Sequence, residues 1–418
     1  METFVRSGFI FGRGAGVIFN TPIMMADGSI KKVQDIQVGD QLMGDDSKPR
    51  NVKQLFRGNA DMYDVIPIKG DKFTVNGDHI LSLKCTNTIS KRWRDDRSCW
   101  QVSWQEFDND QHIVNKSKNL KDENKANVFF ESLKSNKNVV QKGDIIDIKL
   151  KDYLLIKKRV GESNFYIYRK AIDFPYQSVE IDPWFLGYWL GNGHSYSPSI
   201  TTMFSKVVEK TQELYEEQHD IKCYVMTNSK AQTFHVTNNK HGDCFWSKFK
   251  RYNLKNNKHI PLVYLQNDRQ TRMQLLAGIL DSDGHYQESS NQYELTFESE
   301  RLIDDTIYLT RSLGFACYKH SKKGTWTHNG VKKQRTYYRI QIVGQGIEDI
   351  PVILPFKKAQ PRRKNKDVSV TSFKIEQVQN DDFYGFEVDG NHRYLMGDFV
   401  VTHNSNGKLK PITCLSNH

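Results

Sequence analysis

The stretch LAGILDSDG at residues 276–284 ends an apolar segment, and residues 182–194 (DPWFLGYWLGNGH) repeat its pattern. Each copy is typical of an apolar helix with small residues at close spacing, followed by an acidic or amide residue and a glycine. Small residues such as Gly187 and Gly278 allow two helix backbones to approach closely. The repeat therefore predicts two packed helices whose ends bring Asn192 and Asp283 together at the bottom of a groove.

Carboxylates at such a point would bind Mg²⁺, which prefers hard oxygen ligands, and a metal there suits in-line hydrolysis of a phosphodiester. The alternative is a buried helix whose terminal Asp is only a cap. The formal charge is +11 and the pI is about 9.1, which fits a polyanion such as DNA or RNA, or else a solvated Lys/Asn-rich surface. The duplication in a basic chain favours the metal site over the cap.

The second copy resembles the LAGLIDADG motif of dodecapeptide homing endonucleases, and residues 185–193 resemble its first copy. This resemblance implies two αββαββα halves that share a saddle-shaped DNA surface, with metal-dependent cleavage at a long recognition site. The family's catalytic, metal-binding carboxylates correspond to Asp283 and Asn192. The amide of Asn192 departs from the family, carries no charge and is a poorer metal ligand. Nicking, or binding without cleavage, is therefore an alternative to double-strand cleavage.

Family members of the yeast intein type also use one lysine in each half. Local similarity assigns Lys258 to the first half and either Lys357 or Lys358 to the second. A lysine near the scissile phosphate can polarise it or activate water. The basic run at residues 357–366 is expected to follow the DNA backbone and to act as a linker. Its DNA-binding candidates are Arg362, Arg363 and Lys364.

A second basic segment, at residues 89–138, interleaves cations with tryptophans. Its candidate DNA-binding residues are Lys91, Arg92 and Arg94, and its tryptophans are Trp93, Trp100 and Trp104. Cationic side chains hold phosphates, and aromatic side chains stack or pack. The segment is therefore either a DNA-contacting lobe or a surface loop whose tryptophans form a small core.

Both ends of the chain contain short strand-like segments separated by Gly and Asp turns. Asp27-Gly28 between two apolar runs is a hairpin signal, and strand-like alternation continues to about residue 81. The tail from about residue 368 returns to this style. Two β-rich ends around a different middle predict an α+β chain in which one all-β domain is interrupted by an insertion.

The end of the chain carries a self-cleaving combination of residues. The side-chain amide of Asn404 can cyclise onto its own carbonyl and cut the backbone, and His403 can donate a proton to the departing amine. The hydroxyl of Ser405 can act as an acyl acceptor. Residues 384–405 resemble the C-terminal splicing blocks of inteins, and residues 21–44 and 73–79 resemble the N-terminal blocks.

This second resemblance implies a horseshoe-shaped HINT domain. In that domain His79 polarises the N-terminal scissile peptide, with support from Asn76. His392 and Asp398 would lie near the C-terminal scissile bond.

The first residue of an intein is normally Cys or Ser, but intein spacing places that position at Gly16. Glycine has no side chain, so the N–S or N–O acyl shift cannot begin there. Ser7 is too far upstream to replace it, and Gly385 lies near the position where a C-terminal Cys would be needed. We therefore expect cleavage after Asn404 while full splicing is blocked.

The expected organisation is a host (extein) flank at 1–15, a HINT domain at 16–88 and 368–404, a basic linker or DNA-recognition lobe at 89–176, an endonuclease at 177–367, and a second host flank at 405–418. The expected cofactor is Mg²⁺ for the endonuclease and none for splicing. The expected partners are double-stranded target DNA and the host protein. The alternatives are a free-standing, domesticated LAGLIDADG endonuclease and a non-cleaving DNA-binding protein, each with a vestigial splicing domain.

We also expect a soluble, intracellular monomer. The six cysteines are scattered without a CxxC pair, which is typical of reduced thiols. No signal peptide is apparent, and no apolar stretch reaches the roughly 18–20 residues that a membrane helix needs.

Overall fold

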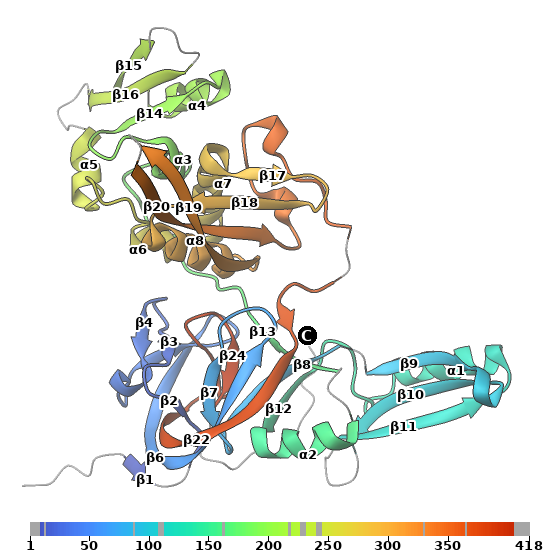
Figure 1. Cartoon of the computed structure of the whole chain (residues 1–418). Coiled ribbons are helices and arrows are strands. Elements are labelled where there is room, and N and C mark those ends of the chain that lie inside the picture. The colour runs from blue at the N-terminus through green and yellow to red at the C-terminus, as the bar shows by residue number, and fades with distance from the viewer. Residues whose placement is uncertain are drawn as a thin grey trace, which may run out of the picture. The chain divides into compact units, whose positions relative to one another are not determined.

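The computed structural model describes residues 9–11, 14–86, 88–107, 113–160, 164–215, 219–225, 231–239, 245–328, 331–363 and 366–404. Ser405 and Lys364, two of the predicted site residues, lie outside the described residues. The chain divides into two compact units (Figure 1). The β unit comprises residues 1–170 and 370–418, and the α+β unit comprises residues 171–369.

The β unit contains two six-stranded sheets that combine strands from both ends of the chain. The first sheet has the order β1-β6-β22-β2-β7, with β5 paired to β6. Its strands are β1 (Phe9–Phe11), β2 (Val17–Ile18), β5 (Gln41–Met43), β6 (Pro49–Pro67), β7 (Phe73–Asn76) and β22 (Phe373–Val388). The second has the order β21-β13-β8-β24-β23, with β12 paired to β8. Its strands are β8 (Ile80–Cys85), β12 (Ile145–Lys149), β13 (Phe165–Tyr168), β21 (Val370–Thr371), β23 (Arg393–Leu395) and β24 (Val401–His403).

The pairing of β6 with β22 joins the two ends of the chain along almost the whole length of both strands. The predicted hairpin at Asp27-Gly28 connects β3 (Pro22–Met24) and β4 (Ile30–Lys32). Gly28 has a φ of 86° there, which a residue without a side chain adopts at no steric cost. The α+β fold class, with an all-β domain interrupted by an insertion, is therefore confirmed.

The β unit extends further along the chain than the sequence predicts. The predicted lobe at 89–176 includes β12 and β13, but both strands pair with β8 in the second sheet. Ile146 and Ile148 of β12 are buried, so this short strand belongs to the core of the β unit. The sequence does not reveal this strand because the charged helix α2 (Leu150–Val160) follows it directly, so the whole segment has a polar composition.

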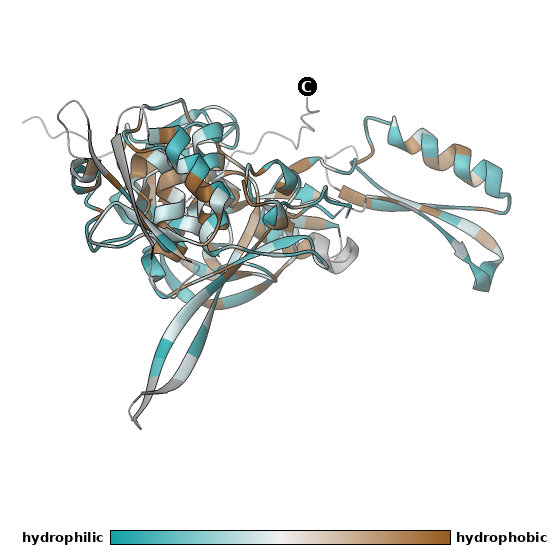
Figure 2. Cartoon of the chain, turned by 90° about the horizontal axis from the view of Figure 1, so that it is seen from above, coloured by the Kyte–Doolittle hydropathy of each residue, from teal (hydrophilic) through white to brown (hydrophobic). Residues whose placement is uncertain are grey.

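The remaining part of the predicted lobe, here called the lobe, is a three-stranded sheet with one helix alongside it (Figures 1 and 2). Its elements are β9 (Ile89–Arg94), β10 (Cys99–Phe107), β11 (Ile113–Leu120) and α1 (Glu123–Lys134). Trp100 and Trp104 pack with Val102 and α1 in a small core. These two tryptophans therefore have the structural role that was the alternative to stacking on bases, whereas Trp93 is 44% exposed.

The α+β unit is built around two helices, α3 (Pro183–Asn192) and α7 (Arg269–Asp283). The first half continues with β14 (Ser199–Thr202), α4 (Ser205–Tyr215), β15 (His219–Val225), β16 (Gln232–Asn239), α5 (Phe245–Arg251) and α6 (Leu262–Leu265). The second half continues with β17 (His285–Gln287), β18 (Gln292–Phe297), α8 (Glu300–Ser312), β19 (Ala316–His328), β20 (Val331–Val343) and the short turn η4 (Pro355–Lys357). The sheet orders are β14-β16-β15 and β17-β18-β20-β19.

The first half departs from the αββαββα pattern at its start. A single bridge between Gly193 and Ile200 stands where the second half has strand β17. None of the described helices is long and apolar enough to cross a membrane.

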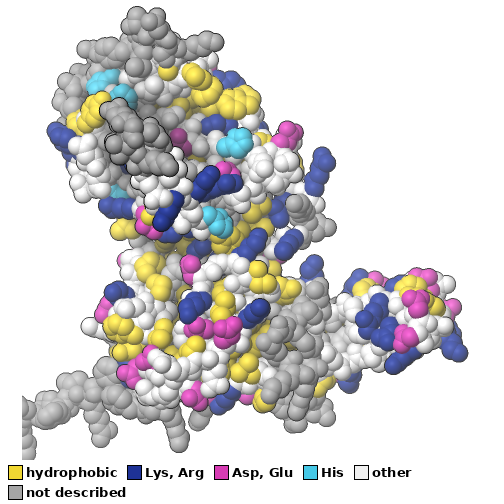
Figure 3. Space-filling view, viewed as in Figure 1, with side chains coloured by type: hydrophobic (Ala, Val, Ile, Leu, Met, Phe, Trp, Pro, Cys, Tyr) yellow, Lys and Arg dark blue, Asp and Glu magenta, His cyan; other side chains and the backbone are white. Residues whose placement is uncertain are grey.

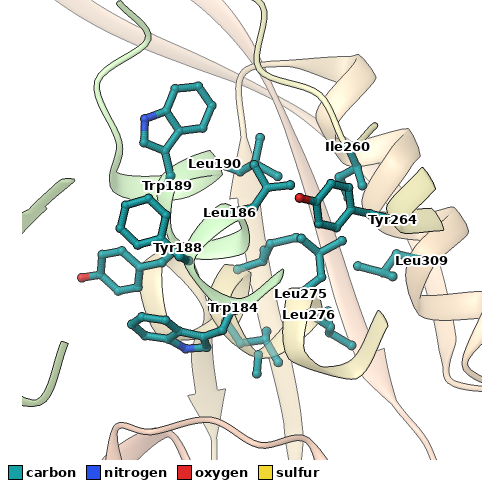
Figure 4. Close-up of a cluster of buried hydrophobic side chains, with 14 of the residues drawn as sticks. Trp184, Leu186, Tyr188, Trp189, Leu190, Ile260, Tyr264, Leu275, Leu276 and Leu309 are labelled. Carbon is teal, nitrogen blue, oxygen red and sulfur yellow. The ribbon is translucent and has the colours of Figure 1, made fainter. Parts of the chain in front are cut away.

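Glycines set the contact between α3 and α7. A Cβ on Gly187 would lie 2.2 Å from the carbonyl oxygen of Leu275, and one on Gly278 would lie 2.0 Å from that of Trp184. The two backbones therefore touch, as the repeat predicts. Around this contact, Trp184, Tyr188 and Trp189 project from the side of α3 opposite Leu186 and Leu190 (Figure 4).

Candidate functional sites

The C-terminal ends of α3 and α7 lie against each other. A Cβ on Gly191 would lie 2.1 Å from Ser282 Oγ and 2.4 Å from Asp283 Oδ2. Asn192, the next residue of α3, donates from its side-chain amide to the Tyr188 hydroxyl at 3.4 Å. The structure thus brings the predicted pair, Asn192 and Asp283, to one place at the end of the helix pair.

Two lysines, one from each half of the unit, contact the C-terminal ends of α3 and α7. Lys258 Nζ donates to the carbonyls of Gly191 at 3.1 Å and Gly193 at 2.7 Å. Lys357 Nζ donates to three carbonyls at the end of α7, those of Leu280, Asp281 and Ser282, at 2.8–3.1 Å. Each ammonium group therefore caps the negative end of a central helix. Lys357 is buried and Lys358 is exposed, so of the two candidates only Lys357 reaches this site.

Asp283, Lys258 and Lys357 influence one another's pKa values. Burial raises the pKa of Asp283, and the cations of Lys258 and Lys357 oppose that rise. Burial lowers the pKa of Lys258 to about 8, against the attraction of Asp283. It also lowers the pKa of Lys357. One carboxylate between two partly desolvated ammonium groups can position and polarise a phosphate.

Few side chains at this site are available to bind a metal ion. Within the described part of the chain, no three His, Cys, Asp or Glu side chains are grouped so as to hold a metal ion. Asp281 is occupied, because it accepts hydrogen bonds from Trp184 Nε1 and from the backbone N–H groups of Ile353 and Leu354. Asp283 and the side-chain oxygen of Asn192 remain. This set fits Mg²⁺, which is often held by one carboxylate together with substrate phosphates and water.

The sheet of the second half presents a polar face away from the core. Tyr293, Ile342 and Cys317 form a buried row across β18, β20 and β19. Side chains alternate along a strand, so the adjacent rows face outward. Residues on this outer face, which sequence reasoning missed, include Thr296, His320, Lys322, Tyr337, Arg339 and Gln341.

The predicted cations of the lobe point in different directions. Arg92 and Arg94 lie on the sheet face opposite α1, where both contact the side-chain oxygen of Gln101. Lys91 lies on the α1 side, with its Nζ 4.4 Å from the centre of the Trp100 ring and paired with Glu123. Lysine and arginine side chains are interspersed with acidic ones on the lobe surface (Figure 3). Lys91 therefore does not join Arg92 and Arg94 on one surface. In the other basic run, Arg363 is exposed, and Arg362 donates to the carbonyl of Lys366 at 3.4 Å.

The N-terminal junction is held by Asn76. Its Oδ1 accepts from the Gly16 N–H at 3.0 Å, and its Nδ2 donates to the Gly14 carbonyl at 2.8 Å. The side-chain amide thus brackets Ala15, whose carbonyl belongs to the peptide bond that an N-terminal splicing step would break. A Cβ at Gly16 would lie 2.5 Å from the Phe383 ring, so the junction is packed around a glycine.

His79 is fully buried between the two junctions. Its Nε2 lies 2.7 Å from Thr402 Oγ1, and the Thr402 hydroxyl also lies 3.3 Å from the Ile80 carbonyl, to which it donates. We assign the Thr402 proton to the Ile80 carbonyl, so that Thr402 accepts from an Nε2–H of His79 and Nδ1 of the ring is unprotonated. Nδ1 has no hydrogen-bond partner among the described residues. Burial, and then the neighbouring His403, lower the pKa of His79 to about 3, so the ring is neutral.

The C-terminal junction lies at the end of β24. The Asn404 N–H donates to the His392 carbonyl at 3.0 Å, and the rings of His392 and His403 are 5.6 Å apart. Asn404 is 1% exposed, and neither atom of its side-chain amide makes a well-formed hydrogen bond with a described residue. Its side chain lies beside the Tyr394 hydroxyl, whose pKa is raised by burial and lowered in part by this neighbour. Burial lowers the pKa of His403 to about 4, and the charge of Asp147 opposes this.

Asp398 lies away from this junction, which corrects its predicted position. It occupies the turn of the β23–β24 hairpin, where its carboxylate pairs with Arg169 at 2.9 Å and accepts from the Val400 N–H. Arg393 pairs with His403 at the other end of the same hairpin. At about 3.4 Å per residue, the turn is roughly 14 Å from Asn404.

A different carboxylate lies near His403. Asp147 of β12 pairs with Arg393 at 2.6 Å and accepts from the Ser82 hydroxyl. Arg393 in turn lies beside His403 across the β23–β24 ladder. Asp147 was missed because it falls in the segment assigned to the lobe, and only the pairing of β12 with β8 brings it here.

Comparisons with known proteins match both units. Residues 18–165 match the family of Hom_end-associated Hint domains, and residues 259–349 match the homing endonuclease family. The chain is 40% identical over 79 residues to the catalytic subunit of the V-type proton ATPase from Candida tropicalis, covering 16% of this chain and 7% of that protein. It is 21% identical to the homothallic switching endonuclease of Saccharomyces cerevisiae, covering 93% of this chain and 79% of that protein.

A solved structure of the homing endonuclease I-DmoI with DNA and Mn is similar at 12% identity and a TM-score of 0.25, covering 39% of this chain and 88% of that one. The matches to the replicative DNA helicase DnaB of Mycobacterium intracellulare and to the Candida tropicalis subunit cover less than a quarter of the length of those two proteins. The two family matches fall on the two units that carry the sites described above.

Proposed function

We propose that this chain, an intein with an inserted homing endonuclease, cleaves its own backbone after Asn404 and binds and cuts a double-stranded DNA target with its α+β unit. The observation that carries the first activity is the state of Asn404. Its amide is buried and makes no well-formed hydrogen bond among the described residues, with the Tyr394 hydroxyl as its neighbour, while its backbone N–H is fixed to His392. Burying an amide without well-formed hydrogen bonds is costly, and such an amide is available to react with its own carbonyl.

Cleavage after Asn404 needs only residues of this chain. The side-chain Nδ2 attacks the Asn404 carbonyl carbon, the bond to the next residue breaks, and a succinimide remains. One proton must leave Nδ2 and one must reach the departing amine. Neutral His403 has one ring nitrogen that accepts and one that donates, so it can serve both transfers.

The N-terminal step is missing. Asn76 holds the Ala15–Gly16 peptide, and His79 offers a neutral ring, but Gly16 has no nucleophilic side chain. The host flanks 1–15 and 405–418 therefore remain unjoined. Incubating the purified chain and weighing its products tests this proposal, with Asn404→Ala as the inactive control.

The α+β unit supplies Asp283, Lys258 and Lys357 to one DNA site. Asp283 with the Asn192 oxygen would hold Mg²⁺, which would supply Lewis-acid stabilisation of the phosphodiester. Lys258 and Lys357 place one ammonium group on each side of the helix ends, one from each half of the unit. A single chain provides both halves, so we propose that it acts as a monomer on DNA inside the cell.

The asymmetry between Asp283 and Asn192 favours cutting one strand over cutting both. An assay on supercoiled plasmid carrying the uninterrupted host site separates the outcomes, because nicking gives open circles and double-strand cleavage gives linear DNA. Asn192→Asp is expected to increase the linear product. Binding without any product from either protein would leave the second candidate, a non-cleaving DNA-binding protein, which the amide at Asn192 favours.

The lobe provides a further DNA-contacting surface in this proposal. A groove of about 280 Å³ on the open face of its sheet is lined by polar side chains, among them Arg92, Gln101, Asn115 and Ser117. Asn115 is an exposed amide among these lining residues, whereas Gln105 is 1% exposed. Amide and guanidinium groups pair with base edges, which supports sequence reading by this groove. Asn115→Leu should weaken binding to the target site more than binding to unrelated DNA.

A further inference from the structure

We propose that the β unit selects the polypeptide upstream of Gly16, requiring glycine at position 14 and a small residue at position 15. This proposal rests on the proposed splicing function, because the upstream segment is then the host flank. The ligand class is an extended peptide that ends in Gly, a small residue and the scissile bond.

Position 14 excludes a side chain for two independent reasons. Gly14 has a φ of 135°, which residues with a Cβ rarely adopt. A Cβ there would also lie 2.8 Å from Phe56 Cγ. Phe56 has little room to yield, because it is buried in a small cluster with Met62 and Phe383. Any residue other than glycine must therefore move the flank off the β unit.

Both the backbone and the side chain of Ala15 are enclosed by the β unit. Asn76 bonds to the groups on either side of Ala15, which fixes the backbone. The Ala15 carbonyl oxygen lies where a Cβ of Gly385 would be, 1.8 Å away, so Gly385 is the residue that admits it. Ala15 is 1% exposed, and a larger side chain has to displace packed neighbours.

Further upstream the contact is made by the backbone. Phe9, Ile10 and Phe11 of β1 pair in parallel with Leu55, Phe56 and Arg57 of β6, whose other edge is taken by β22. Main-chain pairing of an added strand provides affinity. The β unit therefore holds the backbone of this strand and adds steric selection at positions 14 and 15.

Hydrogen exchange measured by mass spectrometry on the full chain tests this directly. In the unchanged chain, exchange at residues 14–18 is expected to be slow, because the Gly16 N–H is bonded to Asn76. Gly14→Ala and Ala15→Leu should accelerate it about tenfold or more. Ala15→Ser should leave it slow.

Gly39→Ala is the matched control for strain alone. Gly39 has a φ of 92°, but a Cβ added there would meet nothing within 4 Å, and the residue lies away from the junction. It should leave exchange at 14–18 unchanged. Equal exchange in the unchanged chain, Gly14→Ala and Ala15→Leu would overturn the proposal, whether or not the chain splices.

A second arm separates this proposal from the splicing function. In a Gly16→Cys/Phe383→Leu background, an added thiol should release the upstream fragment. Phe383→Leu gives Phe56 more room, but the φ of 135° at position 14 still requires glycine, so Gly14→Ala should slow that release about tenfold or more. Release at an equal rate with and without Gly14→Ala would contradict the selection of glycine. No release from the background itself would count against the N-terminal splicing step, and the exchange measurement would still decide the selection.

Discussion

Nε2 of His79 lies 2.7 Å from the hydroxyl oxygen of Thr402, one residue before His403 on the strand that leads to Asn404. This hydrogen bond joins the segment that holds the N-terminal junction to the strand that carries the C-terminal one. We assign the Thr402 proton to the Ile80 carbonyl, 3.3 Å away, which makes Nε2 the protonated nitrogen of His79. We expect this contact to set the tautomer on which His79 depends.

Replacing Thr402 by valine keeps the shape and removes the hydroxyl. In the Gly16→Cys/Phe383→Leu background, we expect Thr402→Val to reduce thiol-induced release at residue 16 at least about tenfold, because His79 loses its fixed tautomer. Nitrogen NMR of the His79 ring should show mixed tautomers. Thr402→Ser should restore both properties, and a Thr402→Val protein with an unchanged ring spectrum would refute the assignment.

The junction around Gly16 is packed for a glycine. A Cβ there would lie 2.5 Å from the Phe383 ring. Gly16→Cys alone is therefore expected to form little thioester, and Gly16→Cys/Phe383→Leu is expected to form more, at a cost in stability of about 1–3 kcal/mol. Thiol-induced release measured by mass spectrometry compares the two. Equal release from both variants would show that the Phe383 ring moves aside for a side chain at residue 16 and does not limit thioester formation.

The two buried histidines make the stability of the β unit depend on pH. Burial lowers the pKa of His79 to about 3 and that of His403 to about 4, below their usual value of 6.5. The unfolded chain therefore binds more protons in this range, so stability is full above pH 6.5 and decreases as the pH falls towards 4. For His403 alone the loss is on the order of 3 kcal/mol. Urea unfolding of the chain and of His403→Gln between pH 4 and 8 measures it, and the variant should show a flatter profile.

Lys357 and Lys358 offer a matched pair for testing the proposed endonuclease site. Lys357 donates to three carbonyls at the end of α7, whereas Lys358 is exposed. We expect Lys357→Met to lower plasmid cleavage or nicking by roughly 10²-fold or more. Lys358→Met should have little effect. The reverse order of effects would place the second-half lysine at residue 358.

The positions of residues that belong to a repeat or to a known motif could be predicted from the sequence. The duplicated helices predict that Asn192 and Asp283 meet, and the glycines between the two helix backbones explain why. The resemblance to the splicing blocks predicts that Asn76 supports His79 at the N-terminal scissile peptide, and in the structure Asn76 bonds to the Gly16 N–H. Residues brought in by distant pairing could not be found. Asp147 approaches His403 only because β12 pairs with β8, and Asp398 is removed from Asn404 only because a hairpin separates them.

Cleavage after Asn404 is tested by the mass of the incubated chain. We expect two products whose masses add up to that of the intact chain, one ending in a succinimide at Asn404 and one beginning at residue 405. Asn404→Ala should stay intact. An unchanged mass for the parent chain under native conditions, or a ligated peptide joining residues 1–15 to residues 405–418, would contradict it.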